Sequence, residues 1–201
     1  MCNLFEFTRL LIKQEILSNT TSYAETHAEV IAQCRRGENA AFKKLYDAYN
    51  KAMFNVCLRM LNNKQEAEDV LQESFISAFK NIQQYSAKAS FGSWLKRIVI
   101  NRCIDSLKKR SLDLIPLAER DLPEEEPSEE ADITFSVEAI KEAISRLADG
   151  YRVIVSLYLF EEHSHKMIAE KLDISEGTSK SQYARAKKKL IEMINLKNNG
   201  S

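Results

Sequence analysis

Basic side chains gather in two short blocks of this 201-residue sequence. Residues 86–110 contain seven Lys and Arg against one acid, and residues 178–197 contain six against one acid. Cations at this density neutralise phosphates, which supplies the sequence-independent part of nucleic-acid affinity. For either block alone, a solvated lysine-rich helix face is an equal alternative. Because both blocks have helical period, together they predict two separate contacts with nucleic acid.

The second block lies in a helix-turn-helix pattern. Ser164 is suited to cap a first helix, whose Ile168 and Leu172 face the core. A turn at Asp173 leads to a second helix over residues 176–195. The second helix of such a pair enters the DNA major groove. Groove contacts are therefore predicted for Lys180, Gln182, Tyr183 and Arg185.

The first block follows a polar loop and continues into a helix over residues 91–110. The apolar period predicts that Trp94 and Ile98 are buried. The side chains predicted to stay outside and meet phosphates or base edges are Arg97, Asn101 and Arg102. The loop at residues 85–90 carries Lys88 as its one charge and is suited to hold an unstacked base of single-stranded DNA.

Other chemically active side chains do not combine into a site. His163 and His165 are two residues apart and do not share a helix face, so a metal pair is not expected. The acids within residues 124–130 stand among prolines without a fixed separation, which excludes acid-base catalysis. The cysteines have no Cys-x-x-Cys spacing and are expected as free thiols: Cys2, Cys34, Cys57 and Cys103. We expect no metal, no cofactor, no small-molecule substrate and no enzymatic activity.

The elements that must position these residues are helices. Apolar residues recur every three or four positions along residues 26–110, which predicts four helices. Residues 111–134 hold all three prolines and nine acids against one base, which predicts a flexible acidic linker. Helical period returns over residues 135–196. The expected fold class is all-α, with two small helical domains joined by the linker.

The formal net charge of zero is a sum of unlike parts. The linker carries −8, and the remaining residues carry +8. Residues 1–25 are not expected to be a signal peptide, because Glu6, Arg9 and Lys13 interrupt the apolar core that a signal peptide needs. We expect a marginally helical extension instead. No run approaches the roughly 20 apolar residues of a membrane helix. These observations predict a cytoplasmic protein.

Three sequence motifs follow one another along the chain. They are Asp69-Val-Leu-Gln-Glu-Ser-Phe75, the pattern Phe91-x-x-Trp94-Leu95-x-x-Ile98-x-x-Asn101-x-x-x-Asp105-x-x-Lys108, and Glu176-Gly-Thr-Ser-Lys-Ser-Gln-Tyr-Ala-Arg-Ala-Lys-Lys-Lys-Leu190. Together they resemble the extracytoplasmic-function (ECF) sigma factors of bacterial RNA polymerase. The resemblance implies a region-two helical bundle at residues 26–110, a region-four helix-turn-helix at residues 135–196, and promoter-specific transcription initiation.

The resemblance also implies partners and site residues. The partners are core RNA polymerase, promoter DNA and an anti-sigma factor that can hold such a protein at the inner membrane. The residues implied in binding the polymerase clamp are Asp69, Gln72, Glu73 and Phe75. Those implied in melting and reading the minus-ten element are Lys88, Lys96, Arg97, Asn101 and Arg102. Those implied in reading the minus-thirty-five element are Thr178, Lys180, Gln182, Tyr183, Arg185 and Lys187.

This sequence departs from the family's pattern at two positions of the last motif. Ser179 stands where an aliphatic residue is common, and Gln182 stands where Arg is common. The departures bear on base preference rather than on docking.

Two other functions compete with the sigma-factor interpretation. A stand-alone helix-turn-helix regulator would bind duplex DNA without polymerase, usually as a dimer on a palindrome, but the first lobe offers no ligand-binding or receiver domain. The second alternative is a helical interaction protein without a DNA role. In that case, replacing Lys180 and Arg185 with Ala would leave promoter-directed transcription unchanged.

Overall fold

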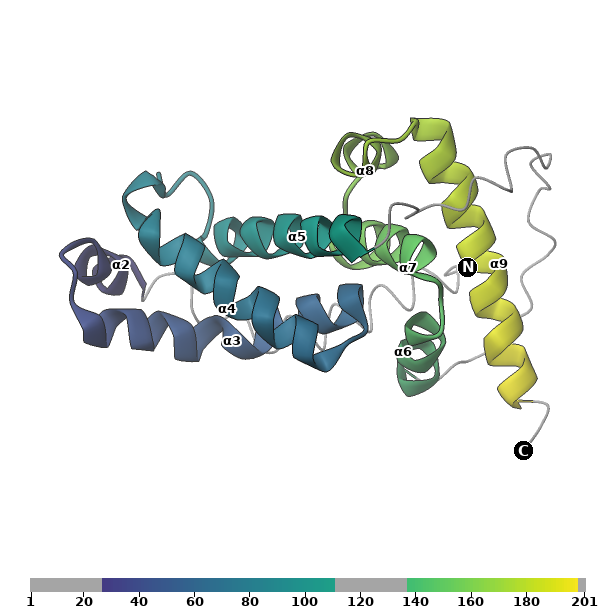
Figure 1. Cartoon of the computed structure of the whole chain (residues 1–201), viewed down its shortest axis with the longest axis horizontal. Coiled ribbons are helices and arrows are strands. Elements are labelled where there is room, and N and C mark those ends of the chain that lie inside the picture. The colour runs from purple at the N-terminus through teal and green to yellow at the C-terminus, as the bar shows by residue number, and fades with distance from the viewer. Residues whose placement is uncertain (1–26, 111–136, 199–201) are drawn as a thin grey trace, which may run out of the picture. The chain divides into compact units, whose positions relative to one another are not determined.

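The computed structural model describes residues 27–110 and 137–198, which belong to two compact units (Figure 1). Every regular element in these residues is a helix, which confirms the all-α fold. The predicted extension at residues 1–25 and the predicted acidic linker at residues 111–134 lie outside the described residues. Within the described ranges, no helix combines the length and the apolar character needed to cross a membrane.

The N-terminal unit, residues 27–110, is a bundle built on three long helices. Its elements are α2 (His27–Arg35), α3 (Asn39–Leu61), α4 (Lys64–Lys80), the 3-10 turn η1 (Ile82–Gln84) and α5 (Phe91–Arg110). Helices α3, α4 and α5 each pack against the other two, and α2 lies against α3 and η1. The largest fully buried side chains of this core are Leu45, Met60, Leu61, Leu95 and Leu107.

Two neighbouring asparagines separate α3 from α4. Asn62 adopts the left-handed conformation, with φ of 52°, and its N–H donates to the carbonyl of Leu58. The side chain of Asn63 then accepts a hydrogen bond from the N–H of Glu66, which caps α4. Asparagine tolerates both conformations well, so the pair ends one helix and begins the next.

Helix α5 buries a different stripe from the one predicted. Phe91, Leu95 and Val99 are at most 3% exposed, and Leu107 continues the same face. Trp94 and Ile98, predicted as the buried pair, are only half-buried. The reason is that α5 lies between α3 and α4, so its core face is wide and centred on the i, i+4 series from Phe91.

In the described part of the C-terminal unit, three shorter α-helices pack against one long helix. Its elements are α6 (Val137–Ser145), α7 (Asp149–Val155), the π-helical turn η3 (Ser156–Phe160), α8 (His165–Leu172) and α9 (Glu176–Asn198). Helix α9 packs against α6, α7 and α8. Its core includes apolar side chains of α6, α7 and α9, among them Ile140, Ile144, Tyr151, Ala186 and Leu190.

The helix-turn-helix forms as predicted. The hydroxyl of Ser164 accepts from the N–H of Met167 and caps α8. Asp173 ends α8 in the left-handed conformation, with φ of 59°. The hydroxyl of Ser175 accepts from the N–H of Thr178 at 2.9 Å and caps α9. A helix-turn-helix often has glycine at the turn, and the aspartate here adopts the same conformation.

Candidate nucleic-acid and protein interfaces

Helix α4 presents polar side chains and one large apolar side chain to solvent. Asp69, Gln72 and Glu73 are exposed, and Ile76 is 53% exposed one turn further along. Their spacing of three and four residues places all of them on one helix face. We call these four residues the α4 surface.

Phe75 does not belong to the α4 surface. It is 3% exposed, and its ring centroid lies 4.8 Å from that of Tyr46 and 5.6 Å from that of Phe79. The helix turns Phe75 into the core beneath the α4 surface, whereas the sequence interpretation placed it among the polymerase contacts. Its i, i+4 spacing from buried Leu71 is the sequence signal that could have shown this.

Ion pairs join α4 to α5 beside the α4 surface. A carboxylate oxygen of Glu73 lies 2.8 Å from the Arg102 guanidinium. Further along, Glu66 accepts from the Ser106 hydroxyl at 2.6 Å and pairs with Arg110 at 2.7 Å. The Glu73–Arg102 pair is partly exposed, so it contributes at most about 1 kcal/mol to stability. It does bring a predicted polymerase contact next to a predicted DNA contact.

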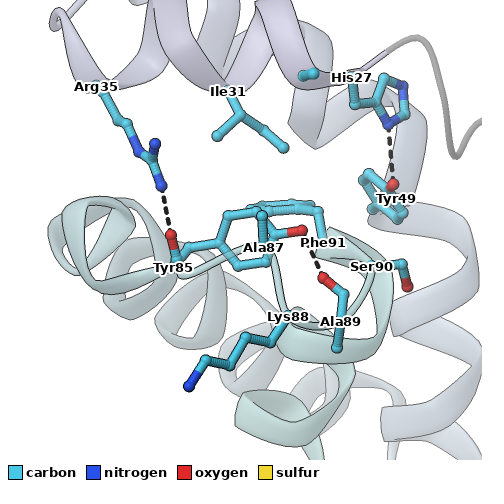
Figure 2. A pocket seen from close by; sticks show the side chains of 11 residues that line it. His27, Ile31, Arg35, Tyr49, Tyr85, Ala87, Lys88, Ala89, Ser90 and Phe91 are labelled. Atoms are coloured by element: carbon cyan, nitrogen blue, oxygen red, sulfur yellow. Dashed lines mark hydrogen bonds between the residues drawn. The ribbon is translucent and has the colours of Figure 1, made fainter.

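The loop before α5 forms one wall of a pocket of about 470 Å³ (Figure 2). The opposite wall comes from α2, with His27, Ile31 and Arg35. The ring of Tyr49 and that of Phe91 contribute to the lining. A cavity of this size is large enough for a nucleobase, since small-molecule sites begin at about 300 Å³.

Hydrogen bonds hold the pocket wall in one conformation. The Tyr85 hydroxyl donates to the carbonyl of Ala89 at 2.6 Å, and the Arg35 guanidinium donates to the carbonyl of Tyr85 (Figure 2). Burial raises the pKa of Tyr85, so its hydroxyl keeps the proton that it donates. Ala87 adopts a left-handed conformation, with φ of 55°, which is rare for a residue with a Cβ.

On the other wall, His27 is tied to α3. Its Nδ1 lies 2.9 Å from the Tyr49 hydroxyl. Burial lowers the pKa of His27, so the neutral imidazole is favoured. Tyr49 also explains the glycine at the start of α5, because a Cβ at Gly92 would lie 2.9 Å from the Tyr49 ring.

The predicted minus-ten residues are placed around this pocket and along α5. Lys88 is exposed in the loop, and Arg97 and Asn101 are exposed one turn apart on α5. Lys96 and Arg102 are half-buried, and Lys96 lies about 100° around the helix from Arg97. Trp94 lies on the same stripe of α5 as Arg97 and Asn101 but is half-buried, and its ring centroid is 5.4 Å from that of Tyr85. The sequence interpretation predicted Trp94 as buried, whereas the structure leaves it half-buried on this stripe.

The exposed face of α9 is centred on its first three turns. Lys180 is exposed, and its ammonium pairs with Glu176 at 2.9 Å. Thr178, Arg185 and Lys187 are half-buried at the edges of this face. Exposed residues that the sequence interpretation missed are Ser181, Ala184 and Lys188, although helical spacing from Gly177 would have indicated them.

Two predicted groove contacts lie on the inner side of α9. Gln182 is 5% exposed, so it is buried against the rest of the unit. Tyr183 is half-buried, with its ring centroid 4.4 Å from that of Tyr158. Both lie on the inner side because α9 turns the i, i+3, i+4 and i+7 series from Ser179 toward the rest of the unit, whereas the sequence interpretation placed them in the DNA groove.

Comparison with known proteins agrees with these two units. The model of Sigma-70 region 2 matches residues 45–112, and the model of Sigma-70 region 4 matches residues 137–190. The ECF RNA polymerase sigma factor SigW of Bacillus subtilis strain 168 is 32% identical over 183 residues, which cover 82% of this chain and 94% of that protein. The chain belongs to the ECF sigma factors. As a sigma factor it directs promoter-specific transcription initiation by RNA polymerase.

Other sigma factors are similar over most of the chain. The ECF RNA polymerase sigma factor SigM of Mycobacterium tuberculosis strain H37Rv is 29% identical over 181 residues, covering 89% of each protein. A solved structure of the sigma factor RpoE in complex with the anti-sigma factor NepR, from Bartonella quintana, is 20% identical with a TM-score of 0.49. It covers 77% of this sigma factor and 96% of that chain.

Proposed function

We propose that this sigma factor binds core RNA polymerase through the α4 surface. Asp69 and Glu73 supply negative charge, which complements a basic partner surface and steers association. Ile76 supplies the apolar anchor that protein interfaces need at their centre. Phe75 supports this surface from the core rather than contacting the polymerase.

The pocket between α2 and the loop at residues 85–90 is proposed to hold an unstacked base of the minus-ten element. The observation that carries this proposal is the preformed pocket at the start of a basic helix, because its loop is fixed by hydrogen bonds before DNA arrives. Trp94 offers a ring beside the pocket for stacking. The cationic and amide side chains that would bind the adjoining strand are Lys88, Lys96, Arg97, Asn101 and Arg102.

Helix α9 is proposed to read the minus-thirty-five element in the major groove. Its N-terminus is capped by Ser175, so the first turn can approach a phosphate. The side chains that would meet DNA are Thr178, Lys180, Ser181, Arg185, Lys187 and Lys188. Gln182 and Tyr183 hold the helix from behind. In this assignment residues 26–110 serve the polymerase and the minus-ten element, and residues 135–196 serve the upstream element.

The remaining properties follow from this role. The sigma factor makes and breaks no covalent bond, needs no cofactor or small-molecule substrate, and works in the cytoplasm where the polymerase is. Its exposed polymerase and DNA surfaces are what an anti-sigma factor would cover. Such a partner would keep it inactive, at the inner membrane if the partner is anchored there.

Equilibrium binding of promoter DNA by the reconstituted holoenzyme tests the proposal. The promoter duplex would carry the fluorescent base 2-aminopurine at successive minus-ten positions, and one position should brighten when its base unstacks into the pocket. Lys180→Ala and Arg185→Ala should each weaken binding and lower the slope of log affinity against log salt by about 1.

Lys141→Ala, a matched change at an exposed lysine of α6, should leave both the affinity and the salt slope unchanged. Unchanged binding by both α9 variants would favour a helical interaction protein instead. Tight, promoter-specific binding by the free chain as a dimer would favour a stand-alone regulator.

A further inference from the structure

Helix α9 carries a buried hydroxyl. Ser179 lies in the first turns of α9 and is 0% exposed. A buried hydroxyl without a partner destabilises the fold, so its hydrogen bond matters. Its partner is His165, the first residue of α8, whose Nδ1 lies 3.0 Å from the Ser179 Oγ.

Two aromatic rings, which also contact each other, pack against His165. Its imidazole stacks on the ring of Tyr158 in η3, with centroids 4.6 Å apart and planes at 17°. The ring of Tyr183 from α9 meets it edge-on at 5.6 Å. The hydrogen bond and the rings therefore join η3, α8 and α9 at one point.

The environment of His165 favours the neutral imidazole. Burial lowers its pKa, Lys180 on α9 lowers it further, and Glu176 on α9 opposes them. The phenol ring of Tyr158 covers one face of the imidazole, and that of Tyr183 meets it edge-on. A neutral imidazole has one nitrogen that donates and one that accepts, so the Ser179 hydroxyl can satisfy Nδ1 in one defined orientation.

We propose that His165 is a positioning residue for promoter recognition: through Ser179 it fixes the rotation of α9, and so the direction in which Thr178 and Lys180 face DNA. Ser179 stands directly between these two side chains in the sequence. An aliphatic residue at this position would pack without a fixed direction, whereas a hydrogen bond to a stacked ring has one. The pair thus accounts for the serine at a position where the family commonly has an aliphatic residue.

Affinity ratios of the holoenzyme test the inference, which rests on the proposed reading of the upstream element by α9. The wild-type holoenzyme first selects a promoter duplex from a random pool. The measured quantity is its affinity for this duplex divided by its affinity for the same duplex with a scrambled upstream element. Ser179→Ala and His165→Ala should each lower the ratio by about tenfold, which corresponds to about 1.4 kcal/mol, because α9 would no longer present Thr178 and Lys180 in the direction that the selected element requires.

The double variant should lose no more than either single variant, because both remove the same interaction. His165→Asn, which keeps a polar atom near the position of Nδ1, should retain most of the ratio. Ser145→Ala on α6 is the matched serine control and should leave the ratio unchanged.

Equal loss of affinity for both duplexes would show a structural role alone and would overturn the inference. So would additive effects in the double variant. A wild-type ratio near one would contradict the proposed upstream recognition itself, and the inference with it. The proposed function stands if only the variants fail to change the ratio.

Discussion

Adjacent residues of α4 have opposite environments, and this difference decides their roles. Phe75 is 3% exposed and lies against other rings, whereas Ile76 is 53% exposed beside Gln72 and Glu73. The motif ends at Phe75 and does not include Ile76. Because one residue is 100° of rotation, the helical period turns Phe75 into the core and Ile76 toward solvent.

Phe75→Ala should lower the free energy of unfolding by about 3–5 kcal/mol, since it leaves a cavity among packed rings. Ile76→Ala should change the free energy of unfolding by less than about 0.5 kcal/mol, because its side chain is exposed. The same change should weaken core polymerase binding about fivefold or more. Urea denaturation and equilibrium binding to core polymerase measure the two effects. Wild-type affinity of Ile76→Ala for core polymerase would show that Ile76 does not contact the polymerase.

His165 should make the C-terminal unit less stable in mild acid. Its pKa in the folded chain lies below the ordinary 6.5, so the unfolded chain takes up the proton first as the pH falls. The free energy of unfolding should therefore fall as the pH drops through about 6.5, and be unaffected by this group at higher pH. His165→Asn should lose less stability than the wild type between about pH 7.5 and 5.5. Equal losses in a denaturant series would contradict this.

Among the elements, the capped helices were the most predictable and the loops the least. Ser164 and Asp173 mark the ends of α8 because their side chains suit those backbone conformations. The stripe that α5 buries could not be predicted, because neighbouring helices set it and apolar residues occur nearly all round that helix. The pocket also could not be predicted, since its walls come from α2 and a loop about 50 residues later.

A glycine in place of Ala87, in the loop at residues 85–90, should stabilise the protein. Ala87 is left-handed, which costs a residue with a Cβ about 1–2 kcal/mol. Ala87→Gly removes this strain, offset by about 0.4–1 kcal/mol of added freedom in the unfolded chain, and should raise stability by about 0.5 kcal/mol. Ala89→Gly is the control, because Ala89 has no positive φ, and it should lower stability. Thermal unfolding compares them, and a loss with Ala87→Gly would contradict the assignment of strain.

At the scale of the whole molecule, the net charge of zero divides into functional parts. The α4 surface is acidic, while α5 and α9 carry the two basic blocks. Helical period and the proline-rich acidic segment predicted the two units, whereas core polymerase as a partner was implied only by the resemblance to the ECF sigma factors. Residue polarity alone could not show which α9 residues are buried, since Ser179 and Gln182 are polar and yet buried.

Transcription from a promoter by core polymerase tests the central claim most directly. Purified sigma factor and core RNA polymerase would be incubated with genomic promoter fragments, and the 5′ ends of the transcripts mapped. We predict starts at defined positions that core polymerase alone does not use. A start pattern identical to that of core polymerase alone would contradict the assignment of this chain as a promoter-specificity subunit.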